Sequence, residues 1–138
     1  MHFTLIDYSE QYFTTLDKDK IPEERTGKFI QVINHNIGME YLIMSPIELS
    51  FFHANIAEKF LSEQGIQGYY NAKKDKYYIN NPEWEIVGGG MWTLDSDNKT
   101  LSFSGKSLAY GDFSPDRLKE KILAAGMFSD YALFVNGR

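Results

Sequence analysis

The sequence predicts a single α+β domain. Segments rich in β-forming residues outnumber helical ones, and two helical patterns lie between the predicted strands. No internal repeat and no linker divides the chain. Its 138 residues, 43% of them hydrophobic, are enough to bury one sizeable core and argue against disorder.

Residues 1–27 are predicted to form an N-terminal extension. Residues 1–16 are mildly apolar and fit a strand or a helix equally well. Residues 17–25 are charged and contain Pro22.

The first predicted strand is Lys28–Asn34, which is rich in β-formers. Residues 35–38 supply turn chemistry, and Met39–Met44 is the expected partner strand. So short a connection favours a β-hairpin.

A strong helical pattern ends near Gln64, where Gly65 follows as a C-terminal cap. Two residues compete for its start: Ser45 opens a capping-box pattern with proline at the first helical position, and Ser50 is a second candidate cap. One helical face carries an apolar stripe with a histidine in it: Leu49, Phe52, His53, Ile56 and Phe60.

Residues 66–82 are rich in tyrosine and lysine, including Lys73, Lys74 and Lys76, and end in Asn-Asn-Pro. We interpret them as an excursion between the helix and the sheet. Tyr77–Ile79 is predicted as a short strand within this excursion.

The next strand, Trp84–Val87, leads into the glycine run Gly88, Gly89 and Gly90. Met91–Leu94 and Thr100–Ser104 then flank a polar turn. This arrangement is the signature of a second hairpin.

The C-terminal part predicts one more helix and one more strand. Ser114 followed by proline opens a helix that ends near Ala125, before Gly126. Tyr131–Val135 is predicted to be the last strand.

Composition excludes several classes of protein. Fourteen basic against nineteen acidic residues give a net charge of −5, which argues against bulk nucleic-acid binding. The absence of cysteine excludes disulfide scaffolds and thiolate chemistry. No apolar run is long enough for a membrane span, and the N-terminus lacks the pattern of a signal peptide, so we expect a cytoplasmic protein.

Familiar metal motifs are missing from the sequence. The histidines His2, His35 and His53 are widely separated, without the pairing of a metal site. A calcium loop beginning at Asp95 would need glycine and glutamate where Thr100 and Lys106 stand. We interpret that acidic segment as a solvated turn.

His53 remains as the candidate catalytic residue. It is either a buried histidine with a hydrogen-bond partner or a general base or nucleophile, since imidazole titrates near neutrality. Near a helix start it would lie beside unpaired backbone amides, where an anion is favoured.

Two further segments could support an anion site. The run of Gly88, Gly89 and Gly90 indicates close approach to the backbone, by a ligand or, equally, by packing or a bulge. Ser107-Leu108-Ala109-Tyr110-Gly111 follows a strand, where its amides would form either an anion-binding nest or an ordinary turn.

In their order and spacing, these segments resemble the Janus/Ocnus family. The resemblance lies in Phe52-His53-Ala54-Asn55-Ile56, in the three glycines, in Ser107-Leu108-Ala109-Tyr110-Gly111 and in Asp130-Tyr131 before the last strand. It covers about residues 28–135. The stretch 66–82 looks like an insertion relative to the family.

The resemblance implies a mixed sheet flanked by two helices and a phosphohistidine phosphatase activity without metal or cofactor. His53 would be the catalytic base. Lys28 would position the phosphate, assisted by the backbone amides of His53 and Ala54. The phosphate-binding turn would comprise Ser107, Leu108 and Ala109.

The same resemblance bears on the helix start and on the partners. Free amides at His53 and Ala54 require the helix to begin close by, which favours Ser50 over Ser45 as its cap. The substrate would be a phosphorylated protein or a small N-phosphate, with no nucleic acid or membrane involved. The oligomeric state stays open.

Two departures from the family pattern put the activity in question. Ser45 and Met91 stand where the family enzyme carries arginines. Hydrogen bonds to charged groups contribute about 1.5–3 kcal/mol each, so their loss weakens phosphate binding unless Lys106 compensates. The alternative function is therefore a non-catalytic relative that binds an anion or a protein partner through the tyrosine- and lysine-rich stretch 66–82.

Overall fold

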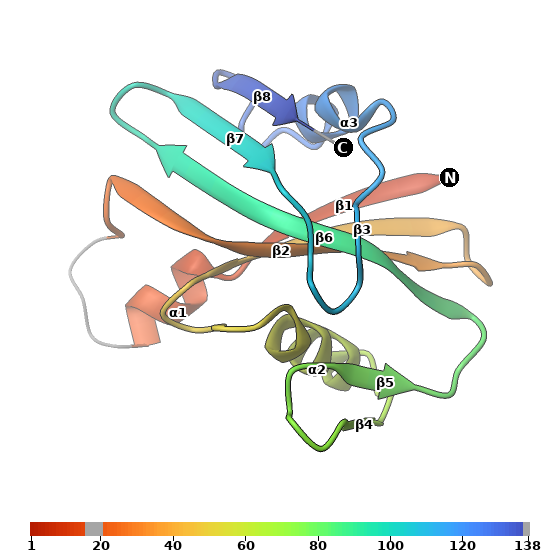
Figure 1. The fold of residues 1–138 in the computed structure, drawn as a ribbon. Helices are drawn as coiled ribbons and strands as arrows, with labels where there is room; N and C mark the ends of the chain where they lie inside the picture. The colour runs from red at the N-terminus through yellow and green to blue at the C-terminus, as the bar shows by residue number, and fades with distance from the viewer. Residues whose placement is uncertain (16–20, 137–138) are drawn as a thin grey trace.

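The fold is built around a curled, mixed β-sheet (Figure 1). The computed structural model describes residues 1–15 and 21–136, and over these residues the main sheet has six strands in the order β1-β3-β2-β6-β7-β8. Their bounds are β1 His2–Asp7, β2 Glu24–Asn34, β3 Met39–Pro46, β6 Trp84–Asp95, β7 Thr100–Ser104 and β8 Ala132–Asn136.

Strand pairing is antiparallel in the middle of the sheet and parallel at its edges. β2 pairs with β3 and with β6, and β6 pairs with β7, all antiparallel. β1 lies parallel to β3, and β8 lies parallel to β7. The two predicted hairpins and the α+β class are confirmed.

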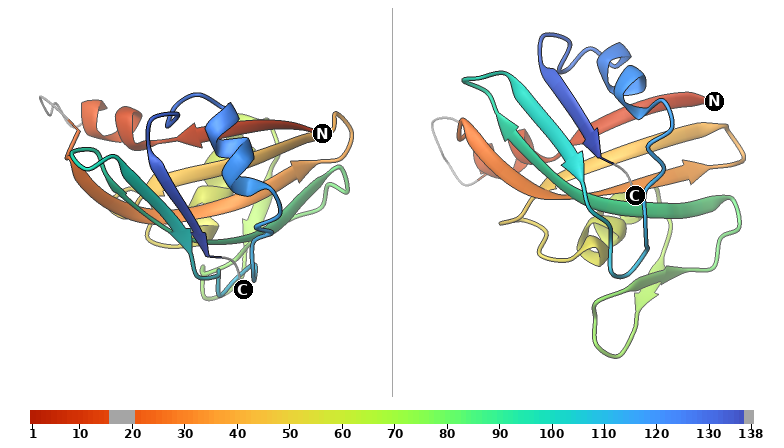
Figure 2. Two further views of the ribbon diagram at one scale, coloured as in Figure 1. Left: turned by 90° about the horizontal axis from the view of Figure 1, so that it is seen from above. Right: turned by 45° about the horizontal axis from the view of Figure 1, so that its top comes forward.

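Helices cover both faces of this sheet (Figure 2). Within the described ranges there are three: α1 Ser9–Thr15, α2 His53–Glu63 and α3 Leu118–Ala124. One core cluster lies between α2 and the sheet, and the other lies between α3 and the opposite face. None of the helices described is both long and apolar enough to cross a membrane.

The third helix, beyond the two expected, comes from the segment predicted as an extension. Residues 2–7 form edge strand β1, which pairs in register with β3 from His2 opposite Met39 to Asp7 opposite Met44. In α1, Phe13 is buried. The β2–β3 hairpin leaves the outer edge of β3 open, and β1 pairs with that edge.

Helix α2 begins later than either predicted cap. Ser45 lies in β3, and Pro46 accepts backbone hydrogen bonds from Leu49 and Ser50 in a tight turn. The buried Ser50 hydroxyl accepts a hydrogen bond from the Ser45 hydroxyl at 2.7 Å. The sequence pattern at Ser45 therefore specifies a turn after the strand.

Helix α3 also begins later than predicted. Ser114 does not cap it, because the helix begins only at Leu118. The Ser114 N–H donates to the Gln31 side chain at 2.7 Å and holds this segment to the sheet. Arg117, just before the helix, has a left-handed backbone with φ 54°. The helical conformation is therefore interrupted between Pro115 and Leu118.

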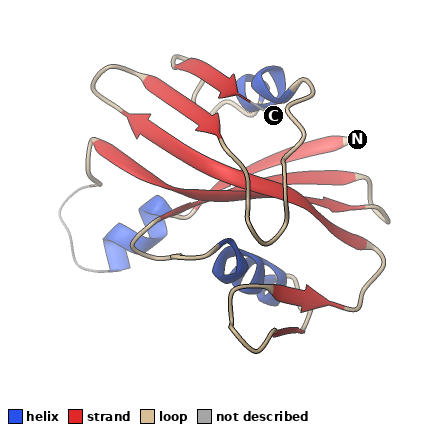
Figure 3. Ribbon diagram, in the orientation of Figure 1, coloured by secondary structure: helices blue, strands red, loops and turns tan. Residues whose placement is uncertain are grey.

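Residues 66–82 contain a small hairpin that packs on α2 (Figure 3). Its strands are β4 Gly68–Tyr70 and β5 Tyr77–Ile79. The predicted strand at 77–79 is confirmed, whereas its partner β4 was not foreseen because it begins at Gly68, and glycine is depleted in strands.

Strand β6 continues through the glycine run instead of ending there. A Cβ on Gly88 would lie 2.0 Å from the Asp112 carbonyl oxygen, and one on Gly90 would lie 2.3 Å from that of Ser104. Gly89 N–H donates to the Gly111 carbonyl at 3.2 Å. The glycines therefore admit close packing of neighbouring backbone.

Candidate functional site

A cavity of about 490 Å³ opens beside the middle of the sheet and the start of α2. Lys28 on β2 and Met91 on β6 are cross-strand neighbours, and both line it. Phe52 and His53 line it from the first turn of α2. The site thus joins two strands and a helix terminus.

The remaining wall comes from two connecting segments. The β4–β5 hairpin contributes Asn71, Asp75 and Lys76. The segment between β7 and α3 contributes Lys106, Leu108 and Ala109. The lining therefore carries more positive than negative side chains, which favours an anionic ligand.

A tyrosine joins these two segments. The Tyr110 hydroxyl donates to the Tyr77 carbonyl at 2.8 Å and accepts from the Tyr77 N–H at 2.9 Å. Burial raises the pKa of Tyr110 to about 12, so the hydroxyl keeps its proton at physiological pH. The hairpin and the β7–α3 segment are thereby held together.

The His53 ring has a defined tautomer. Its Nε2 lies 2.8 Å from the Gly90 carbonyl oxygen, which can only accept, so Nε2 carries the hydrogen. In the neutral ring the lone pair is then on Nδ1. Nδ1 has no hydrogen-bond partner among the described residues and is not one of their buried unpartnered atoms. The basic nitrogen is therefore not fully enclosed, and His53 lines the cavity.

The electrostatic environment keeps His53 neutral. Burial lowers its pKa from 6.5 to about 4, the hydrogen bond to Gly90 opposes this shift, and the positive charge of Lys28 adds to it. At pH 7 the imidazole is therefore unprotonated and able to accept a proton.

This lowered pKa predicts a pH-dependent stability. Between pH 6.5 and about 4 the unfolded chain binds a proton at His53 that the folded chain does not, so the free energy of unfolding falls as pH falls through this window. We expect the titration of His53 to lower the free energy of unfolding by about 2–3 kcal/mol as pH falls through this window. Urea denaturation at pH 7 and pH 4.5 measures it, and a His53→Gln variant should lack this component. Identical pH dependence in both proteins would contradict the prediction.

The first turn of α2 presents free backbone donors. The Phe52 N–H donates to the Asn55 side chain at 2.8 Å, and the Asn55 N–H donates to the Phe52 carbonyl at 3.0 Å. The amides of His53 and Ala54 make no hydrogen bond with any residue the structure describes. Together with the helix dipole, they favour an anion at this end.

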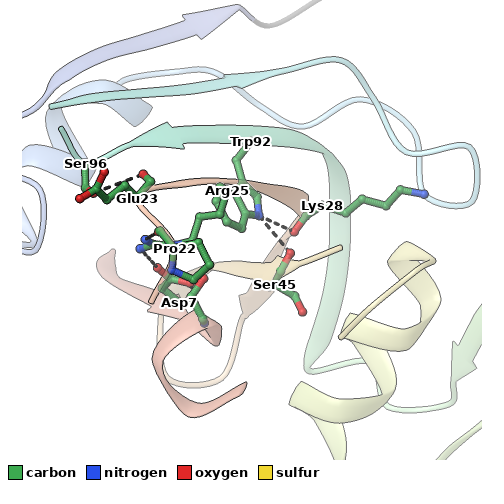
Figure 4. A network of polar contacts seen from close by, with 9 residues as sticks. Asp7, Pro22, Glu23, Arg25, Lys28, Ser45, Trp92 and Ser96 are labelled. Atoms are coloured by element: carbon green, nitrogen blue, oxygen red, sulfur yellow. Dashed lines mark hydrogen bonds and ion pairs between the residues drawn. The ribbon is translucent and has the colours of Figure 1, made fainter. Parts of the chain in front are cut away.

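Lys28 is held at its backbone and extended at its side chain (Figure 4). The Trp92 indole N–H donates to the Lys28 carbonyl at 3.0 Å and to the Ser45 carbonyl at 3.2 Å. The Lys28 ammonium lies 5.6 Å and 5.8 Å from the ring centroids of Phe51 and Phe52. It thus stands beside the start of α2, where cation–π contacts orient it.

The segment 107–111 is a closed turn. Ser107 and Gly111 exchange backbone hydrogen bonds, and the Ser107 hydroxyl accepts from the Tyr110 N–H at 3.0 Å. Ser107 is buried and its amide is engaged within the turn. Leu108 and Ala109 line the cavity, and their amides have no partner in the described part of the chain.

The structure brings together most of the predicted site. Five of its residues line one cavity: Lys28, His53, Lys106, Leu108 and Ala109. Ala54 is buried behind His53, and Gly89 lies under the imidazole, where a Cβ would be 2.9 Å from Cδ2. Gly88, Gly90 and Ser107 support this arrangement without lining the cavity.

The two positions where the resemblance leads us to expect arginines differ. Met91 is 45% exposed and lines the cavity, whereas Ser45 is fully buried and bonded to Ser50. Sequence reasoning did not place the hairpin residues Asn71, Asp75 and Lys76 beside His53. The lysines around position 74 were a signal, but nothing local indicated that the hairpin folds back over the site.

No known family model and no curated protein matches this sequence. Among the residues described, no group of histidine, cysteine, aspartate or glutamate side chains is arranged to hold a metal ion. The chemistry of the site is therefore argued from its own geometry.

Proposed function

We propose that the protein is a phosphatase-like hydrolase of N-phosphates, acting in the cytoplasm on phosphohistidine or a related compound without metal or cofactor. The observation that carries this proposal is the neutral His53, which lines a cavity rich in cations and whose basic Nδ1 has no hydrogen-bond partner among the described residues. The Janus/Ocnus resemblance supports the same role for this residue. The substrate is either a phosphorylated protein or a small N-phosphate.

The phosphoryl group would bind where positive charge and free donors converge. Lys28 supplies a formal charge, and the amides of His53 and Ala54 supply hydrogen bonds. Leu108 and Ala109 offer further amides from the opposite wall. Such preorganised donors stabilise charge in the transition state.

His53 would act as the general base. Nδ1 takes a proton from water, the water oxygen bonds to phosphorus, and the P–N bond breaks with its electron pair going to nitrogen. The proton returns to that nitrogen, so phosphohistidine and water become histidine and phosphate. A bound phosphoryl dianion raises the pKa of His53, which strengthens the base when substrate is present.

The direct test is release of phosphate from a phosphohistidine peptide in the presence of a chelator. We expect turnover that the chelator leaves unchanged. A parent protein that releases no phosphate from this peptide or from phosphoramidate would overturn the proposal.

Replacing Lys28 by glutamine is expected to weaken phosphate binding. Loss of a charged hydrogen-bond donor costs about 1.5–3 kcal/mol, which raises the Kd of phosphate roughly 10- to 150-fold. Calorimetric titration measures the change. Lys119→Gln, which removes an exposed charge outside this cavity, is the matched control and should bind phosphate normally. If the two variants bind phosphate with equal Kd values, the assignment of Lys28 to the phosphate site is wrong.

One observation favours a second function, a non-catalytic anion or partner binder. Met91 lines the cavity where the resemblance calls for an arginine, and Ser45 is buried away from it. Binding of phosphate without turnover would support this second function and exclude the first.

A further inference from the structure

Lys76 adds a positive charge to those of Lys28 and Lys106 on the cavity wall, and it lies on the hairpin within the stretch that the resemblance predicts as an insertion. Its ammonium lies 5.0 Å from the ring centroid of Tyr78 and 5.8 Å from that of Tyr110. These two rings orient the charge and leave it free for a ligand, since Lys76 is in none of the ion pairs formed by described residues.

The backbone that carries Lys76 is fixed. The Asn71 side chain accepts hydrogen bonds from the N–H groups of Asp75 and Lys76 at 3.0 Å and 3.1 Å. Its amide also donates to the Asp75 carboxylate at 2.6 Å, which partly satisfies that negative charge. The Tyr110 hydroxyl then holds the following residue, Tyr77, to the β7–α3 segment. The position of Lys76 is therefore built into the hairpin.

Lys28 and Lys76 occupy different parts of the cavity. Lys28 lies on the sheet beside the start of α2, and its charge contributes to the low pKa of His53. Lys76 lies against Tyr78 of the hairpin and against Tyr110. The two charges thus define two ends of one site.

The cavity also has room for more than one phosphoryl group. Pockets of about 300–1,000 Å³ accommodate organic ligands, and this one measures about 490 Å³. A single phosphate beside Lys28 and His53 would leave the Lys76 end unfilled.

We infer that the cavity binds a ligand with two anionic groups, a phosphoryl group at Lys28 and His53 and a second anion at Lys76. The inference rests on the proposed function for the placement of the phosphoryl group. The second group is a phosphate or a carboxylate in the same molecule, because an ammonium attracts either as a point charge.

Binding of inorganic phosphate and methylenediphosphonate tests this inference without requiring turnover. A third probe, phosphonoacetate, replaces the second phosphonate by a carboxylate. Isothermal titration is carried out on the parent, on Lys76→Gln and on Lys73→Gln, a matched control because Lys73 is exposed on the same hairpin but does not line the cavity.

We expect the parent to bind at least one of the two-anion probes more tightly than phosphate. Lys76→Gln should weaken that probe about tenfold or more and leave phosphate unchanged, because it removes one charged contact. Lys73→Gln should change neither. Whichever two-anion probe loses more affinity in Lys76→Gln identifies the second group.

Several outcomes would overturn the inference. If the parent binds all three probes with equal affinity, it has no second anion subsite. The same conclusion follows if Lys76→Gln affects phosphate and the two-anion probes equally. If either result is obtained while the protein still releases phosphate from the phosphohistidine peptide, the two-anion inference fails and the proposed function stands. If the two-anion probes depend on Lys76 but no N-phosphate is hydrolysed, the proposed function fails and the binding site stands.

Discussion

A His53→Gln variant is expected to hydrolyse phosphohistidine about 10²- to 10⁴-fold more slowly than the parent, because it lacks a general base. Glutamine retains a donor that can reach the Gly90 carbonyl, so the fold and the anion site are preserved. Phosphate release under single-turnover conditions measures the loss, and phosphate titration checks that binding persists.

The matched control for this variant is His35→Gln. His35 is an exposed histidine at the far end of β2, where its Nε2 lies 2.7 Å from Glu85. The His35→Gln variant should hydrolyse phosphohistidine at the same rate as the parent. If His53→Gln turns over as fast as the parent, the assignment of His53 as the base is wrong, whatever the affinity for phosphate.

Gly89→Ala is expected to have the second largest effect, acting on both stability and rate. A Cβ there would lie 2.4 Å from the Phe29 carbonyl oxygen and 2.9 Å from Cδ2 of His53, so β2 or the imidazole must move. Overpacking of this kind costs about 1–3 kcal/mol. A displacement of the base by about 1 Å lowers the rate about 10²-fold.

Gly126→Ala separates these two effects. Gly126 follows α3 with φ 89° and has open space where a Cβ would lie, so alanine there strains the backbone by about 1–2 kcal/mol without touching the site. Urea denaturation should show comparable losses of stability in both variants. Only Gly89→Ala should lose activity at a temperature where both are folded; equal rates would show that His53 tolerates the shift.

Most of the fold was predictable because local patterns specify it. The hairpins around residues 35–38 and 95–99 and the strand at Tyr77–Ile79 follow from turn chemistry and β-forming side chains. The helix starts were misplaced because tertiary contacts at Ser45 and Ser114 hold both segments in non-helical conformations. Ser45 bonds to Ser50, and the Ser114 amide bonds to Gln31. Such contacts depend on tertiary structure.

The site was predictable only in part for the same reason. His53, Lys28 and the 107–111 segment carry recognisable residue types, and they meet at one cavity. Lys76 joins them because Tyr110 binds the backbone of Tyr77, which is 33 residues away in the chain. Likewise, the imidazole reaches its carbonyl partner only because Gly89 has no side chain. Neither relation has a local sequence signal.

The pair of hydrogen bonds at the Tyr110 phenol has a mechanical consequence. The Tyr110 hydroxyl donates one hydrogen bond to the backbone of Tyr77 in β5 and accepts another from it. The hairpin therefore cannot move outward without breaking both hydrogen bonds together. Displacing the hairpin costs both bonds at once, which favours an entrance of constant width that selects ligands by their size.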